Sequence, residues 1–309
     1  MALLLIETAV AESSVDYSER LDAAWDFDRP AESEARFRAL VSQQPPQSRE
    51  AAEALTQVAR AQGLQRNFSG ADTTLDRVQT SLDALPARVR VRYLLERGRR
   101  DNSSQRKAQA IAWFEQALGA SSSDTLPGAA YYRVDALHML AIAAPPEQQL
   151  EWHRRAIDAA GAADDARTRG WRGSLLNNLG WTLHDQGHYT EALDCWRQAL
   201  AAREAANDVP RARIARWTVA RGLRSLGKLD EAEVLQRALA DELQAANAPD
   251  GYVFEELAEI ALARGDRKAA QPWAAKAFAL LGDDPDLKAN DAARLAHLAE
   301  LAKPATAAR

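Results

Sequence analysis

Cysteine is nearly absent from this sequence, because Cys195 is the only one in 309 residues. A single thiol cannot form a disulfide within the chain, and it cannot build a zinc site that needs several thiolates. Its place beside Trp196 in an apolar helical pattern predicts a packed or semi-exposed side chain that is unreactive. The cysteine content is compatible with a reducing compartment.

Long apolar runs are also missing. No stretch reaches the roughly 18 consecutive apolar residues that indicate a transmembrane helix. The short run at 2–6 has no basic residue before it and is followed at once by Glu7, unlike the pattern of a signal peptide. We therefore expect no membrane partner and a cytoplasmic location.

An excess of positive charge is missing as well. The chain has 39 basic and 44 acidic residues, which gives a formal net charge of −5. This balance disfavours nucleic acid or an anionic membrane as a partner of the whole surface, although a local basic patch is still allowed. Apolar residues make up 47% and charged residues 27%, a composition typical of a folded globular protein.

Sequence signatures of catalysis are not present. The chain has no Walker loop, no glycine-rich dinucleotide fingerprint and no serine nucleophile elbow. His184 and His188 have a spacing that can bind a metal on one helix face, but Gly187 interrupts the helical pattern between them. We interpret both histidines as exposed turn residues. The sequence predicts a non-enzymatic protein with no catalytic residue, no cofactor and no metal.

What the sequence does contain is a pattern of small and large residues, clearest in Asn177–Leu200. Large apolar residues recur at helical spacing on both sides of Gly187, which predicts two helices joined by a short turn. The glycine suits the left-handed position that ends the first helix. We expect Gly180 to face Ala192 and Ala199, because only small residues let two crossing helices approach closely.

The pattern recurs along the chain. Positions equivalent to Ala199 are Ala39, Val78, Ala117, Ala156, Ala238 and Ala277. Successive positions are 39 residues apart, except for an interval of 43 between Ala156 and Ala199, and the four extra residues add about one helical turn. A period of this length is typical of a solenoid in which stacked helical hairpins share one core.

The stretch "NNLGWTLHDQGHYTEALDCWRQAL" resembles a tetratricopeptide repeat. The matching residues are Leu176, Leu179, Gly180, Leu183, Gly187, Tyr189, Ala192, Trp196 and Ala199. Arg216–Leu239 and Tyr252–Phe278 resemble the repeat less closely, and Leu55–Val78 and Ser104–Leu118 only in part. The resemblance implies an all-α, right-handed α-solenoid of about seven helical hairpins, with a period longer than the standard one of the family.

We expect one superhelical domain over residues 1–303, followed by a disordered tail at 304–309. The expected hairpin units are about 17–45, 50–83, 86–121, 127–163, 173–206, 213–247 and 251–284, with a C-terminal cap helix at 287–302. Pro145 and Pro146 are well placed to open the second helix of the fourth unit. Pro272 lies inside the second helix of the seventh unit and is expected to kink it or delay its start.

The resemblance also implies a binding surface, because such solenoids use the concave face formed by the first helix of each hairpin. The inner positions that it indicates are Asn177, Asn178, Trp181, His184 and Asp185 in the fifth unit, Arg92, Glu96, Arg99 and Asn102 in the third, Trp217, Arg221 and Arg224 in the sixth, and Tyr252, Glu255, Glu256 and Glu259 in the seventh. Asn178 matches the place where peptide-binding members carry an asparagine that holds a peptide backbone. The alternative is that Asn177 and Asn178 are ordinary exposed helix residues and that the two tryptophans belong to the core.

Three hypotheses follow for function. The leading one is a scaffold that binds a peptide or partner protein in its groove through Asn177, Asn178, Trp181, Arg99, Trp217, Arg221 and Arg224. The arginines of the sixth unit predict an acidic partner, because a guanidinium can donate two parallel hydrogen bonds to a carboxylate. One alternative is a regulatory or structural subunit that self-associates. Another is helical-repeat RNA binding, which the glutamates of the seventh unit disfavour because they interrupt a basic track.

Overall fold

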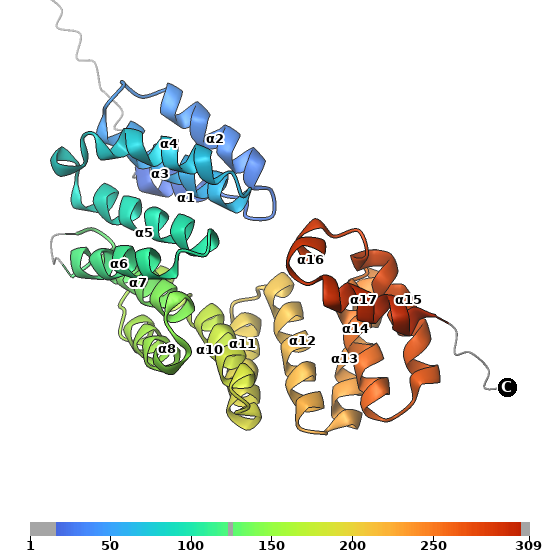
Figure 1. Cartoon of the computed structure of the whole chain (residues 1–309). Coiled ribbons are helices and arrows are strands. Elements are labelled where there is room, and N and C mark those ends of the chain that lie inside the picture. The colour runs from blue at the N-terminus through green and yellow to red at the C-terminus, as the bar shows by residue number, and fades with distance from the viewer. Residues whose placement is uncertain (1–16, 123–125, 304–309) are drawn as a thin grey trace, which may run out of the picture. The chain divides into compact units, whose positions relative to one another are not determined.

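The computed structural model describes residues 17–122 and 126–303, and every regular element in this part of the chain is a helix (Figure 1). The predicted all-α repeat architecture is confirmed. The tail expected to be disordered, residues 304–309, lies outside the described residues. The chain divides into two compact units, residues 1–152 and 153–309. We call them the N-terminal unit and the C-terminal unit and describe each separately.

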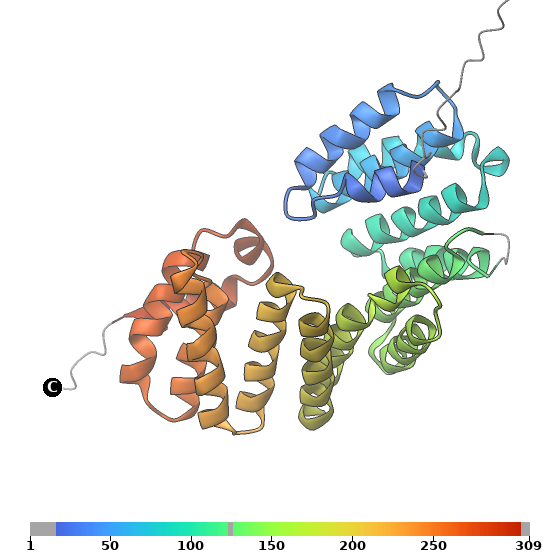
Figure 2. The ribbon, with the colours of Figure 1, turned by 180° about the vertical axis from the view of Figure 1, so that it is seen from behind.

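The N-terminal unit is built from helical pairs (Figure 2). Its helices are α1 (Tyr17–Ala23), α2 (Pro30–Ser42), α3 (Arg49–Leu64), α4 (Phe68–Gln79), the short 3-10 helix η1 (Leu82–Ala84), α5 (Ala87–Ser103), α6 (Lys107–Ala120), α7 (Ala129–Ala143) and the first part of α8 (Pro146–Gly161). The hairpins α3–α4 and α5–α6 each pack their two helices together, and the first helices α3, α5 and α7 also pack on one another in sequence order. The N-terminal unit therefore has the contact pattern of a helical repeat.

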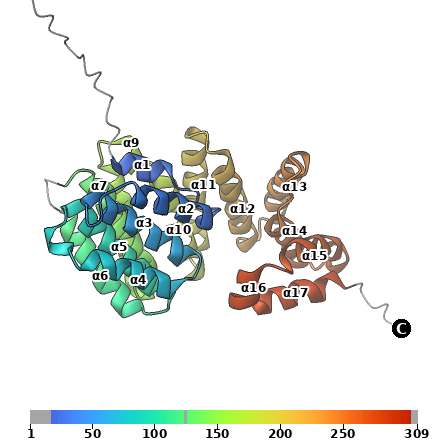
Figure 3. The same ribbon diagram turned by 90° about the horizontal axis from the view of Figure 1, so that it is seen from above.

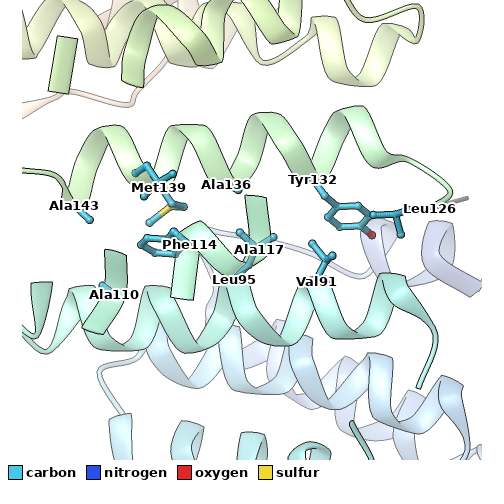
Figure 4. Packing of buried hydrophobic residues seen from close by; sticks show 11 residues of the cluster. Val91, Leu95, Ala110, Phe114, Ala117, Leu126, Tyr132, Ala136, Met139 and Ala143 are labelled. Atoms are coloured by element: carbon cyan, nitrogen blue, oxygen red, sulfur yellow. The ribbon is translucent and has the colours of Figure 1, made fainter. Parts of the chain in front are cut away.

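The core of the N-terminal unit lies between the first and the second helices of the hairpins. Figure 4 shows one cluster, in which Phe114 of α6 lies between Leu95 of α5 and Met139 of α7. Phe114 and Leu95 are fully buried. Such burial stabilises the fold by about 1.5–3 kcal/mol for each large side chain. A single hairpin could not bury these side chains alone, so the stacking of neighbours completes the core.

The C-terminal unit repeats the arrangement (Figure 3). It contains the rest of α8, then α9 (Ala166–Arg169), α10 (Arg172–Asp185), α11 (Tyr189–Ala205), α12 (Val209–Ser225), α13 (Leu229–Ala245), α14 (Gly251–Ala263), α15 (Arg267–Leu281), α16 (Pro285–Asn290) and α17 (Ala292–Ala302). Each helix from α10 to α14 packs on the next one along the chain, the first helices α12 and α14 contact each other, and α17 packs on α15. The assignment of all hairpins to one superhelical domain stays a prediction.

The turns inside the hairpins of the C-terminal unit use a glycine in the left-handed conformation, as predicted for Gly187. Gly187 has φ of +83°, and the next amide, from His188, donates to the carbonyl of Leu183 at 2.8 Å. This bond closes the Schellman motif that ends a helix. Gly227 and Gly265 hold the equivalent positions with φ of +71° and +78°. The sequence therefore predicted these turns correctly wherever glycine marks them.

Gly180 is a close-approach position, but its nearest neighbour differs from the expected one. A Cβ atom added to Gly180 would lie 2.3 Å from Nε1 of Trp196, rather than against Ala192 or Ala199. Trp196 lies between Ala192 and Ala199 in the sequence of α11. Its indole is fully buried and fills the space that the glycine leaves. The small residues thus make room for a large aromatic ring, not only for a second backbone.

Two prolines behave differently from each other. Helix α8 begins at Pro146, as predicted. Helix α15 begins at Arg267, before Pro272, and continues to Leu281, so the proline does not delay the start. Asp266 caps this helix by accepting a hydrogen bond from the amide of Ala269 at 2.8 Å, which fixes the first turn independently of the proline.

The C-terminal cap region contains two helices, α16 and α17, where one was expected. The helix is interrupted at Asp291. The side chain of Asp291 accepts a hydrogen bond from the amide of Arg294 at 3.3 Å and caps the second helix. An aspartate in this position favours the start of a new helix over the continuation of the old one. Leu298 and Leu301 of α17 are buried against the last hairpin.

Cys195 is buried on α11. Burial, with a smaller effect from the nearby carboxylates of Asp194 and Glu191, raises the pKa of its thiol to about 11. The thiol is therefore protonated at neutral pH and lacks the thiolate that reacts as a nucleophile. This agrees with the unreactive side chain that the sequence predicted.

Candidate functional site

Six of the seven candidate binding residues lie in the C-terminal unit, on the first helices of two consecutive hairpins. Asn177, Asn178 and Trp181 come from α10. Trp217, Arg221 and Arg224 come from α12. All six side chains are half-buried, so each combines a packed part with a part that water or a ligand can reach.

Aromatic rings run from helix to helix along this face. The ring centroids of Trp181 and Trp217 are 5.8 Å apart, and those of Trp217 and Tyr252 of α14 are 6.3 Å apart. The indole of Trp217 donates a hydrogen bond to the carbonyl oxygen of Tyr252 at 3.0 Å. Trp181 also packs edge-on against the buried Trp196 at 5.1 Å. The two candidate tryptophans therefore belong partly to the core and partly to the surface.

The side chains of the two asparagines use only part of their hydrogen-bonding capacity within the protein. Nδ2 of Asn177 donates to Oδ1 of Asn178 at 3.3 Å, and the backbone carbonyl of Asn177 accepts from Nε1 of Trp196 at 3.1 Å. The amide nitrogen of Asn178 has no partner among the residues that the structure describes. A carboxamide in this state can donate to a main-chain carbonyl, which is how an asparagine holds an extended peptide.

The arginines of α12 are already engaged by a glutamate. Arg224 forms a two-pronged pair with Glu256 of α14, with Nε to Oε1 at 2.5 Å and Nη2 to Oε2 at 3.2 Å. Burial alone would lower the pKa of Arg224, but the hydrogen bond and charge of Glu256 raise it. Arg221 is 3.7 Å from the same carboxylate and lies over the ring of Trp181 at 5.4 Å. One buried glutamate thus serves two arginines.

The remaining inner positions of the seventh unit are paired toward the cap. Glu255 accepts two hydrogen bonds from Arg294 of α17, at 2.6 and 2.5 Å. Arg294 also lies over the ring of Tyr252 at 5.1 Å. Glu259 is 2.9 Å from Nε2 of His297. The cap helix α17 therefore supplies the partners of these two glutamates, Arg294 for Glu255 and His297 for Glu259.

His184 corrects one expectation. It is half-buried rather than an exposed turn residue, with Nε2 2.8 Å from the hydroxyl of Ser225 and its ring against Trp181 and Trp196. Burial, followed by the charge of Arg221, lowers its pKa. His188 is exposed at the start of α11, as expected. Across residues 17–122 and 126–303, no group of three or more His, Cys, Asp or Glu side chains is placed to hold a metal ion.

Arg99 belongs to the N-terminal unit, so the structure does not group it with the other six candidates. Its guanidinium bonds to Glu96 at 2.6 Å and to the buried carboxylate of Asp135 on α7. Glu96 and Arg92, two other inner positions of the third unit, are buried. Glu53 of α3 pairs with Arg92 at 3.2 Å, so ion pairs on the inner face of the N-terminal unit tie α3, α5 and α7 together.

Two neighbouring pockets beside α12 were not predicted. The smaller, about 170 Å³, is lined by Gly173, Ser174, Asn177, Asn178, Ala199, Arg203, Arg211, Ile214 and Ala215. The larger, about 510 Å³, is lined by Pro210, Arg213, Ile214, Trp217, Leu239, Leu243, Asp250, Tyr252 and Val253. Ile214 lines both, and its side chain is 57% exposed. The polar pocket with the asparagines and the apolar pocket therefore lie on two sides of one residue.

Helix α12 carries an unusual charge pattern that the sequence could have shown. Val209–Ser225 contains five arginines and no acidic residue. Asp208 pairs with Arg203 at 3.4 Å and with Arg211 at 2.9 Å. Glu242 of α13 pairs with Arg213 and Arg216 at 2.8 and 2.5 Å. Glu256 pairs with two further arginines, Arg221 and Arg224. Three carboxylates are thus paired with six guanidinium groups.

In the part of the chain that the structure describes, none of the helices is both long enough and apolar enough to span a bilayer.

The stacked helical hairpins define a helical-repeat protein of the solenoid class. Residues 173–209 match the tetratricopeptide repeat family model, which covers α10 and α11 and the asparagine pair. The chain is a protein of the tetratricopeptide-repeat type. No curated protein sequence matches the chain.

Solved structures support this assignment at the level of the fold. The chain is similar to the structure of NprR in complex with its cognate peptide NprX, with 15% identity, a TM-score of 0.56, and coverage of 93% of this chain and 84% of that one. It is similar to a tetratricopeptide repeat protein from Parabacteroides merdae, with 15% identity, a TM-score of 0.52, and coverage of 93% and 98%. Aspartyl phosphate phosphatase F from Bacillus subtilis has 13% identity, a TM-score of 0.58, and coverage of 96% and 86%.

Proposed function

We propose that this protein is a non-enzymatic scaffold that binds a peptide, or a peptide-like segment of a partner protein, along α10 and α12 of the C-terminal unit. The observation that carries the proposal is the state of Asn178. Its amide nitrogen has no partner among the described residues, and its side chain lines a pocket. A helical residue that is half-buried and only partly hydrogen-bonded is suited to hold a ligand backbone.

Three further observations support the proposal. Trp181 and Trp217 supply rigid, partly exposed aromatic surface next to the asparagines, and aromatic residues carry much of the binding energy in protein interfaces. The matched repeat, residues 173–209, includes Asn177 and Asn178. One structure of similar fold is itself a complex with a peptide. The single cysteine fits a reducing compartment, and the proposal places the protein in the cytoplasm.

Asn178→Ala is expected to weaken peptide binding about fivefold to tenfold, because one hydrogen-bonding side chain contributes about 1–1.5 kcal/mol. Peptides are first selected from a displayed random library on the intact chain. Their dissociation constants are then measured by isothermal titration calorimetry. The melting temperature should stay within a degree or two, because the amide of Asn178 contributes little to packing.

Gln244→Ala is the matched control, because Gln244 is an exposed helical amide on α13. It should bind like the parent chain. Equal affinity of the parent and Asn178→Ala chains would move the binding site away from α10. Static light scattering on the same samples separates peptide binding from self-association, and a titration with generic RNA at two salt concentrations tests the third hypothesis.

A further inference from the structure

The larger pocket beside α12 offers apolar surface and little else. Leu239, Leu243 and Val253, all buried, form part of its lining. Its two charged side chains are already committed: Arg213 donates to Glu242 at 2.8 Å, and Asp250 accepts from the amide of Tyr252 at 2.8 Å. A group that enters the pocket gains chiefly from the removal of apolar area from water.

This pocket is continuous with the surface that we propose to hold a peptide backbone. Ile214 lines both the apolar pocket and the pocket that contains Asn177 and Asn178. Trp217, whose ring lies next to that of Trp181, forms another part of the apolar pocket. A peptide whose backbone bonds to Asn178 therefore has an apolar pocket next to it for one of its side chains.

Beside each pocket two arginines share one carboxylate, and the lining of the apolar pocket adds a second carboxylate, Asp250. Arg203 and Arg211 share Asp208 beside the polar pocket, and Arg213 and Arg216 share Glu242 beside the apolar one. Each carboxylate neutralises only one of its two guanidinium groups. Arg221 and Arg224 share Glu256 in the same way, further along α12. This excess stands out in a chain whose net charge is −5.

We infer that the site recognises an acidic segment carrying one large apolar side chain, which enters the pocket lined by Trp217, Leu239 and Val253. The inference rests on the proposed function and names the chemistry of the partner. The under-neutralised arginines attract the acidic residues that flank the apolar one. The pocket then holds the apolar side chain, and the asparagines fix the backbone between them.

The test is a selection of peptides from a displayed random library on the intact chain. We expect enriched sequences with more Asp and Glu than Lys and Arg, and with Leu, Ile, Met, Phe or Trp at one fixed position. Enriched peptides without this composition would overturn the inference and leave peptide binding in place. The absence of any enriched peptide would remove both, so the two failures are distinguishable.

Two pairs of variants locate the effect. Ile214→Glu places a carboxylate at the residue shared by the pockets and should weaken binding of the selected peptides about tenfold or more. Val234→Glu is its matched control, since Val234 is an apolar residue of α13 that is 72% exposed and belongs to neither pocket. Equal losses in both variants would contradict the assignment of the pocket.

Arg213→Gln removes one of the two guanidinium groups that share Glu242, while Arg216 keeps the glutamate paired. Binding should weaken about threefold to fivefold at low salt, and its dependence on salt should become shallower. Arg197→Gln changes the charge equally at an exposed position of α11 and should have no such effect. An unchanged salt dependence in Arg213→Gln would refute the acidic part of the inference.

Discussion

Arg92→Leu is expected to lower the free energy of unfolding by about 3–5 kcal/mol, the typical cost of breaking a buried ion pair by removing one partner. The Arg92 side chain donates to the hydroxyls of Tyr132 on α7 and Ser18 on α1, at 3.0 and 2.8 Å. It also pairs with Glu53 on α3 at 3.2 Å and with Asp22 at 3.4 Å. Its loss therefore removes contacts to three other helices at once.

The measurement is a urea unfolding curve followed by circular dichroism. Arg90→Leu is the control, because Arg90 is exposed on the same helix and its replacement should change stability by no more than about 0.5 kcal/mol. In Arg92→Leu, Glu53 keeps its ion pair with Arg88 at 2.9 Å, so the measured loss reports the contacts of Arg92 itself. A parent-like curve for Arg92→Leu would show that the network contributes no net stability.

Gly180→Leu is expected to destabilise the C-terminal unit by about 1–3 kcal/mol, or by more if the ring cannot move. An added Cβ already lies 2.3 Å from Nε1 of Trp196, and this indole is held by its hydrogen bond to the carbonyl of Asn177 at 3.1 Å. Relief of the clash would break that bond and shift a fully buried side chain. The asparagine pair would be displaced with it.

Gly119→Leu provides the contrast. Gly119 is an exposed residue of α6 with no atom within 4 Å of an added Cβ. Leucine there should leave stability unchanged or raise it by about 0.5–1 kcal/mol, because leucine favours the helix more than glycine does. Thermal melts of the two variants test the register of the hairpin directly. Equal melting temperatures would mean that Gly180 does not face the second helix.

The repeat could be predicted from the sequence because the positions equivalent to Ala199 recur along the chain and because glycine marks the turns of the C-terminal unit. Two turns of the N-terminal unit use the same conformation without glycine: Arg66 and Gln105 have φ of +59° and +65° at the positions equivalent to Gly187. Stacking on neighbouring hairpins over-determines these turns, so the strain of a side chain there is tolerated. This is why the early repeats resemble the family only in part, although their helices follow the same period.

The candidate site was predictable only as a set of positions. Helical offsets indicated that Arg221 and Arg224 belong to the inner face, yet they could not show that Glu256 of the next hairpin already binds both. Such contacts depend on how neighbouring repeats are rotated against each other, which the sequence period does not determine. The apolar pocket lined by Ile214, Trp217 and Val253 was not predicted for the same reason. The arginine-rich composition of α12 was the one signal of it in the sequence.

The indole cluster of Trp181, Trp196 and Trp217 has an optical consequence. The ring centroid of Trp181 lies 5.1 Å from that of Trp196 and 5.8 Å from that of Trp217. These distances are short enough for the excited states of the three rings to couple. Two of the rings are partly open to solvent, so displacement of water from them changes the emission of the whole group. The protein thus carries a native chromophore beside Asn178, and occupancy of that surface is readable in the ultraviolet without a label.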